Sequence, residues 1–158
     1  MPIQPGDAIP EVTLKHIDDG VHTIDTPTLF AHRKVVLFAV PGAFTPTCSE
    51  RHLAGFVEHF DAFRERGIEV ACMAVNDPFV MQAWGESQNV PQGLRILSDG
   101  NGDFARALGL EMDASAYGMG VRSKRFALYA EDGVVSQLFV EAPGEFKVSS
   151  AEHVLASI

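Results

Sequence analysis

Two apolar runs with a helix-forming segment between them constrain the fold of this chain most strongly. The runs KVVLFAV (Lys34–Val40) and IEVACMAV (Ile68–Val75) are short and rich in β-branched residues, as buried strands are. From Cys48 onward, apolar residues recur at helical spacing, and the segment RERG predicts a helix end with Gly67 just beyond the last turn. A strand, a helix and a strand in this order predict a right-handed crossover between two parallel strands.

Two further helices are predicted from the residues that begin or end them. Asp77 and Pro78 are typical of an N-cap followed by a first helical residue, and this helix should end near Gly85. The segment GDFARALGL predicts a short helix closed by Gly109, after a short strand at RILSD. We interpret residues 114–120 (ASAYGMG) as an exposed loop.

The last part of the chain predicts an antiparallel hairpin and a final helix. The runs RFALYA and VVSQLFVE flank Glu131–Gly133, whose Asp-Gly pair is a strong hairpin signal. Ser149 and Glu152 fit a capping box at the start of a last helix. Together with the early crossover, these elements predict an α/β fold with a central mixed β-sheet and helices on both faces. The thioredoxin arrangement fits this pattern, and other three-layer folds fit it equally well.

Length, composition and charge narrow the function classes. The 158 residues are 46% hydrophobic, which is enough for one core, and we expect a single domain over residues 1–158. The net charge of −9 argues against a nucleic-acid partner, and the densest basic run, Arg122–Arg125, is too short to change this. No apolar run approaches the length of a membrane span, and the N-terminus does not resemble a secretory signal. With only two cysteines, we expect a cytoplasmic protein whose thiols are reduced.

The segment VPGAFTPTCSERHLAGF places a cysteine at a predicted helix start. With Thr45 as N-cap and Pro46 as the first helical residue, Cys48 is the third residue of the helix. An unpaired backbone N–H and the positive end of the helix dipole would favour its thiolate, lowering a pKa that is normally about 8.5. The hydroxyl of Thr45 could donate to an incoming oxygen or to the sulfur. An inert cysteine behind a good helix start fits this spacing equally well.

The same residues carry a resemblance to a known family. Pro41, Thr45 and Cys48 form the pattern P-x-x-x-T-x-x-C, which resembles the active-site signature of the peroxiredoxins. The fuller segment is similar to their type II subfamily, as are VACMAVNDPFVMQAWG, ILSDGNGDFARALGL and GVRSKRFALYAEDGVV. The resemblance covers almost the whole chain. It implies a thioredoxin-like fold and an enzyme that reduces hydrogen peroxide and alkyl hydroperoxides without a bound cofactor or metal.

The resemblance implies a role for each of four residues. Cys48 would attack the nearer peroxide oxygen and become a sulfenic acid. Thr45 and the backbone N–H of Cys48 would hold the peroxide, and Pro41 would shield the sulfur from water. Arg125 would stabilise the thiolate and the leaving oxygen, because its guanidinium stays charged at any relevant pH.

Alternatives remain for four basic residues. Arg122 and Lys124 share the short basic run of Arg125, which we prefer because it immediately precedes a predicted strand. A solvated charge at a strand edge is the alternative for Arg125. His52 lies one helical turn after Cys48 and is either an accessory to the site or a buried histidine that orients the backbone or a dimer edge.

The second cysteine decides how the sulfenic acid is reduced. Cys72 lies within an apolar strand, which favours a buried structural thiol. The segment EFKVSS stands where the atypical mammalian branch of the subfamily has its resolving cysteine, and it contains none. The resemblance therefore implies a one-cysteine enzyme reduced by glutathione, with or without glutaredoxin. The alternative is a Cys48–Cys72 disulfide reduced by thioredoxin, which needs Cα atoms within about 7 Å; we expect no stable pairing.

The sequence leaves three other functions to consider, and it also suggests a homodimer. A metal site on Cys48, His52 and His59 lacks further ligands, and a cysteine hydrolase with His52 as base lacks an orienting group. A non-enzymatic redox sensor or holdase would use the same cysteine chemistry. We expect a homodimer formed through apolar residues of FTPT, DPFVMQAW and the loop around Tyr117, unless Phe79 and Trp84 belong to the core.

Overall fold

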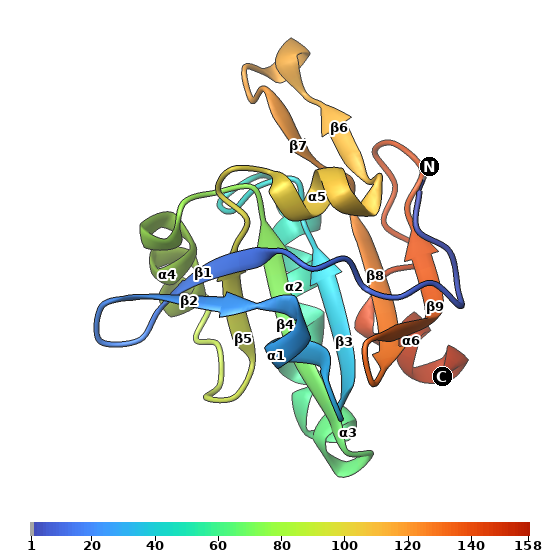
Figure 1. Ribbon diagram of the computed structural model, residues 1–158. Coiled ribbons are helices and arrows are strands. Elements are labelled where there is room, and N and C mark those ends of the chain that lie inside the picture. The colour runs from blue at the N-terminus through green and yellow to red at the C-terminus, as the bar shows by residue number, and fades with distance from the viewer. Residues whose placement is uncertain (1) are drawn as a thin grey trace.

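The computed structural model describes residues 2–158, with all of their side chains except those of Thr47 and Cys48. Within these residues, a seven-stranded mixed sheet has helices on both faces, and a separate two-stranded hairpin projects from it (Figure 1). The strands are β1 (Thr13–Ile17), β2 (Val21–Asp25), β3 (Lys34–Ala39), β4 (Ile68–Ala74), β5 (Arg95–Ser98), β6 (Glu111–Asp113), β7 (Val121–Ser123), β8 (Phe126–Glu131) and β9 (Val134–Val140). The helices are α1 (Thr26–Phe30), α2 (Thr47–Glu58), α3 (Phe60–Glu65), α4 (Pro78–Ser87), α5 (Asp103–Leu108) and α6 (Ala151–Ser157), with a 3₁₀ turn, η1 (Ser115–Tyr117). None of the helices in this part of the chain combines the length and the apolar character needed to cross a lipid bilayer.

The register of the sheet brings two distant segments together. The strand order is β2-β1-β5-β4-β3-β8-β9, and β3, β4 and β5 are parallel, as the predicted crossover requires. β8 runs antiparallel to β3, and the predicted hairpin joins β8 to β9 with Asp132 and Gly133 at positive φ. Because Ala39 pairs with Phe126, the residues that follow β3 lie beside those that precede β8.

Alternation along β3 divides the core into two halves. Val36 and Phe38 face the side covered by α2, α3, α4 and α6. Val35 and Leu37 face the side covered by α1 and α5. Figure 1 shows α1 and α5 in front of the sheet and α2 behind it. A strand buried on both faces needs apolar residues throughout, which explains the run that predicted it.

The helix that carries the cysteine begins one residue later than predicted. Its N-cap is Pro46, which makes no side-chain capping bond, so the prediction of Thr45 as N-cap is wrong. Cys48 is therefore the second helical residue rather than the third. The physical reason is that the Thr45 hydroxyl lies 2.6 Å from the carbonyl oxygen of Gly42 and 2.7 Å from Oγ of Ser49, away from a capping position.

The predicted single helix is two helices. His59, with φ −97° and ψ 11°, separates α2 from α3. The apolar spacing did not reveal this break because Phe56, Phe60 and Phe63 are all buried on the same side of the sheet. Gly67 follows α3 with a φ of 73°, as its predicted place beyond the helix end requires.

Other boundaries differ in smaller ways. Asp77 caps α4 by accepting from the N–H of Val80 at 2.8 Å, as predicted, and the helix extends to Ser87. The final helix is capped by Ser150 rather than Ser149, because Ser149 is turned toward Glu141. The stretch 114–120 is a mostly exposed loop, as predicted, and it forms the turn of the β6–β7 hairpin and contains η1.

Candidate active site

The loop that follows β3 is held in place by close packing. The N–H of Ala43 donates to Oδ1 of Asn76, which ties the loop to the segment after β4. A Cβ on Gly42 would lie 2.9 Å from Cγ2 of Thr45 and 3.1 Å from Nη1 of Arg122, so any larger residue would force these side chains to move. Pro41 is partly buried at the start of this loop. The segment from Pro41 to Thr45 is therefore compact.

Thr45 belongs to a short chain of hydroxyl contacts at the start of α2. Its Oγ1 lies 2.7 Å from Oγ of Ser49, and Nη2 of Arg125 donates to that same Oγ at 2.9 Å. Ser49 is completely buried. No motif in the sequence singles it out, and the contact forms because Thr45 lies just before the N-cap of α2 while Ser49 lies in its first turn. Ser49 thus links Thr45 to Arg125.

Arg125 reaches this site because it immediately precedes β8, as predicted. Besides its bond to Ser49, its Nη1 lies 3.2 Å from Nδ1 of His52. The carbon of its guanidinium lies 5.9 Å from the ring centroid of Phe146, a cation–π distance. These contacts come from α2 and from the segment after β9, so the guanidinium is directed toward the start of α2.

His52 is completely buried and uses both ring nitrogens. Its Nε2 lies 2.8 Å from the carbonyl oxygen of Ser149, which can only accept, so Nε2 carries the hydrogen. Nδ1 is then the acceptor for Arg125. Burial, and next the charge of Arg125, lowers the pKa of His52 to about 3. A neutral imidazole with both nitrogens engaged is neither a metal ligand nor a general base, and its position fits an accessory role.

The structure gives other partners to Arg122 and Lys124, the alternatives to Arg125, and it also bears on a metal site. Nε of Arg122 donates to the carbonyl of Met119 at 2.8 Å, within the hairpin that packs on Gly42. The N–H of Lys124 donates to the carbonyl of Leu110. Among the residues whose side chains are described, no group of three or more histidine, cysteine, aspartate or glutamate residues could hold a metal ion.

Cys72 lies in the core, as predicted. It is completely buried in β4, where it pairs with Phe38 of β3 and Ile96 of β5. Burial raises the pKa of its thiol, although the charge of Arg125 opposes this. A protonated, inaccessible thiol is a poor nucleophile. The side chain of Cys48 lies outside the described residues, so its predicted contacts with Thr45 and Arg125 stay predictions.

Three large apolar side chains in the predicted contact segments are exposed. Phe44 is 54% exposed, Phe79 at the start of α4 is 64% exposed, and Tyr117 in the hairpin is 83% exposed. Trp84 is completely buried in the core. The predicted contact surface is therefore present at Phe79 but not at Trp84. Trp84, unlike Phe44, Phe79 and Tyr117, contributes to the core.

The whole chain resembles proteins of one family. A family model described as Redoxin matches residues 4–155. The chain is 44% identical to peroxiredoxin-2B of Arabidopsis thaliana, over 99% of each chain. It is 50% identical to the chloroplastic peroxiredoxin-2E-2 of Oryza sativa, over 97% of this chain and 71% of that one. Among solved structures, reduced Prx3 of Vibrio vulnificus in complex with hydrogen peroxide has a TM-score of 0.93 and 48% identity, over 98% of each chain.

Proposed function

The chain belongs to the type II peroxiredoxins, and on this premise we propose that it reduces hydroperoxides with Cys48 as the attacking thiolate. Its fold is the thioredoxin-like fold of that family, and peroxiredoxins are thiol-dependent peroxidases that need no prosthetic cofactor. One observation carries the assignment of the site: Arg125, Ser49 and Thr45 form a hydrogen-bonded series at the start of the helix that contains Cys48. We propose that residues 1–158 act as one peroxidase domain.

In the proposed reaction, the Cys48 thiolate attacks the nearer oxygen of the peroxide. The S–O bond forms as the O–O bond breaks, the departing oxygen takes a proton and leaves as water or alcohol, and the sulfur becomes a sulfenic acid. Negative charge develops on the departing oxygen, so fixed donors accelerate this step. Arg125 supplies a permanent charge, and Thr45 and the backbone N–H of Cys48 supply hydrogen bonds. Pro41 limits the access of water to the sulfur.

We propose that the sulfenic acid is reduced from outside, by glutathione with or without glutaredoxin. Two features support this. Cys72 is a completely buried thiol in a central strand, so it would have to leave the core to pair with Cys48. The segment in which a resolving cysteine would stand contains serines instead, and one of them, Ser149, is completely buried. Reduction by thioredoxin through a Cys48–Cys72 disulfide is the competing route.

A homodimer and a reducing compartment complete the proposal. Phe44, Phe79 and Tyr117 would cover one another's exposed apolar surface across a contact between two copies. We propose the cytoplasm as the compartment, since Cys72 is a free thiol. Sedimentation tests the first proposal: a 17.1 kDa particle at working concentration would argue against the dimer. Localisation of the tagged full chain tests the second, and retention in an organelle would contradict it.

Three proteins test the proposed function: the wild type, Cys48→Ser and Cys72→Ser. Peroxide consumption is followed with glutathione plus glutaredoxin, and separately with thioredoxin. We expect Cys48→Ser to be inactive and Cys72→Ser to retain most of the turnover with glutathione and glutaredoxin. Peptide mapping after one equivalent of peroxide separates the two routes of reduction. A dominant bridge between residues 48 and 72 would overturn the one-cysteine assignment.

A further inference from the structure

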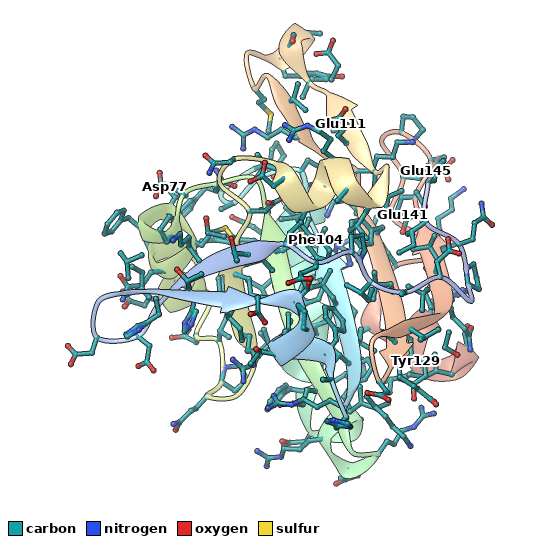
Figure 2. The ribbon with its side chains drawn as sticks, in the orientation of Figure 1. Asp77, Phe104, Glu111, Tyr129, Glu141 and Glu145 are labelled. Carbon is teal, nitrogen blue, oxygen red and sulfur yellow. The ribbon has the colours of Figure 1, made fainter. Side chains whose placement is uncertain are left out.

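Glu141 is a buried carboxylate to which the proposed reaction assigns no part. It follows β9 directly and is only 6% exposed. Its own N–H donates to the carbonyl of Arg125 at 3.0 Å, because the start of β8 and the end of β9 are paired. Its backbone is therefore fixed beside that of the arginine. Glu141 is labelled in Figure 2, together with Glu145 of the loop that follows it.

The Glu141 carboxylate organises the segment that precedes α6. It accepts from the backbone N–H groups of Lys147, Val148 and Ser149 at 2.8–2.9 Å and from Oγ of Ser149 at 2.7 Å. Burial raises its pKa, but these hydrogen bonds, led by that of the Ser149 hydroxyl, outweigh burial and hold the pKa below its usual value. An ionised carboxylate thus gathers four donors from three consecutive residues.

The opposite side of this segment reaches the arginine. With its N–H turned to Glu141, Ser149 presents its carbonyl to Nε2 of His52 at 2.8 Å. That bond keeps the hydrogen of His52 on Nε2 and leaves Nδ1 free to accept from Nη1 of Arg125 at 3.2 Å. Phe146 packs against both groups: its ring centroid lies 5.0 Å from that of His52 and 5.9 Å from the guanidinium carbon of Arg125.

We propose that Glu141 is a positioning residue for Arg125, acting in series through the carbonyl of Ser149 and the tautomer of His52. The proposal rests on the proposed function, because it assigns Arg125 to the stabilisation of the Cys48 thiolate. Without the carboxylate, three N–H groups lose their acceptor and the Ser149 carbonyl is no longer held against His52. His52 can then move its hydrogen to Nδ1, where it opposes the N–H of Arg125, and the guanidinium loses a partner.

The direction in which the Cys48 pKa shifts distinguishes this positioning role of Glu141 from a simple effect of its charge. Removing a negative charge near a thiol lowers the thiol pKa through space, because the thiolate is repelled less. Displacing Arg125 raises the pKa of Cys48, because the thiolate loses its cation. Glu141→Gln removes the charge and keeps the side-chain shape, but its NH2 group replaces one of the two accepting oxygens and its neutral carbonyl accepts more weakly than a carboxylate. A rise in the Cys48 pKa therefore requires the positioning role.

The pKa of Cys48 is measured from the pH dependence of its alkylation by iodoacetamide, in the Cys72→Ser background. We expect Glu141→Gln to raise it by about one unit and to lower kcat/KM for hydrogen peroxide about tenfold. Glu145→Gln is the matched control, since Glu145 lies in the same loop but is exposed and pairs only with Lys147 at 3.7 Å among the contacts described for its side chain. It should leave both quantities unchanged. In a His52→Asn background, Glu141→Gln should no longer raise the Cys48 pKa, because the series is already interrupted and only the through-space effect of the lost charge remains.

A folded Glu141→Gln variant with an unchanged or lowered Cys48 pKa overturns the proposal, as does an undiminished rise in the His52→Asn background. If circular dichroism shows that Glu141→Gln does not fold, Glu141→Asp replaces it. Asp keeps the charge but is one methylene shorter, so a smaller rise is expected, and an unchanged pKa again overturns the proposal. Failure of the proposed function is distinct: the wild type would then consume no peroxide, whereas alkylation needs no turnover.

Discussion

Burial of a neutral His52 makes the stability of this protein fall at mildly acidic pH. The imidazole has a pKa of about 3 in the folded chain, against an ordinary 6.5. Below about pH 6.5 the unfolded chain binds a proton at this residue, and the folded chain does not until about pH 3. Because the unfolded state binds more protons in this window, the free energy of unfolding falls as the pH falls.

The magnitude follows from these two values. At about pH 5 the unfolded histidine is almost fully protonated and the folded one almost neutral, which destabilises the fold by about 2 kcal/mol relative to about pH 7.5. The residue is completely buried and engages Ser149 and Arg125, so solvent does not screen this effect. His16 adds to it, because burial, and then the charges of His22 and Arg95, lowers the pKa of His16 as well.

Urea unfolding of the wild type and of His52→Asn at both pH values isolates the contribution of His52. Both proteins share His16, Glu141 and every other titrating group, so their difference in pH dependence belongs to residue 52. We expect the wild type to lose about 2 kcal/mol more than the variant between about pH 7.5 and about pH 5. Equal losses in the two proteins would refute the assignment of a buried, neutral imidazole.

Three further substitutions probe the site and the contact surface. Arg125→Lys keeps the charge but cannot donate to Ser49 and His52 in the same planar arrangement, so kcat/KM for peroxide should fall about 100-fold while circular dichroism is unchanged. Gly42→Ala places a Cβ 2.9 Å from Cγ2 of Thr45, so it should lower the free energy of unfolding in urea by about 1–3 kcal/mol and also lower the peroxidase activity. Full activity would contradict the close packing. Phe79→Glu should shift sedimentation from dimer toward monomer and leave the melting temperature of the monomer unchanged, since this side chain is 64% exposed.

The strongly patterned elements could be predicted from the sequence, and the weakly patterned ones could not. β3 and β4 are buried on both faces, so their apolar runs mark them directly. β2 has no fully buried residue, and β6 and β7 have three residues each, so neither a run nor an alternation identifies them. The break at His59 escaped because the apolar spacing continues across it.

The site divides in the same way. Thr45 and Cys48 lie close in the sequence, where a motif can identify them, and Arg125 was chosen for its place before a strand. The bonds from His52 to Arg125 and to Ser149 join residues 73 and 97 positions apart. Local patterns carry no information about such pairs. The contacts arise from the register of β3 with β8 and from the carboxylate that shapes the segment before α6.

The pH dependence of Cys48 oxidation by hydrogen peroxide, followed by stopped flow in the Cys72→Ser background, tests the central claim most directly. If donors around the start of α2 hold this sulfur as an anion, the rate constant is already at its plateau at neutral pH, with an apparent pKa well below about 8.5. A rate constant that keeps rising through about pH 8.5, at the speed of a small free thiol, would contradict the account.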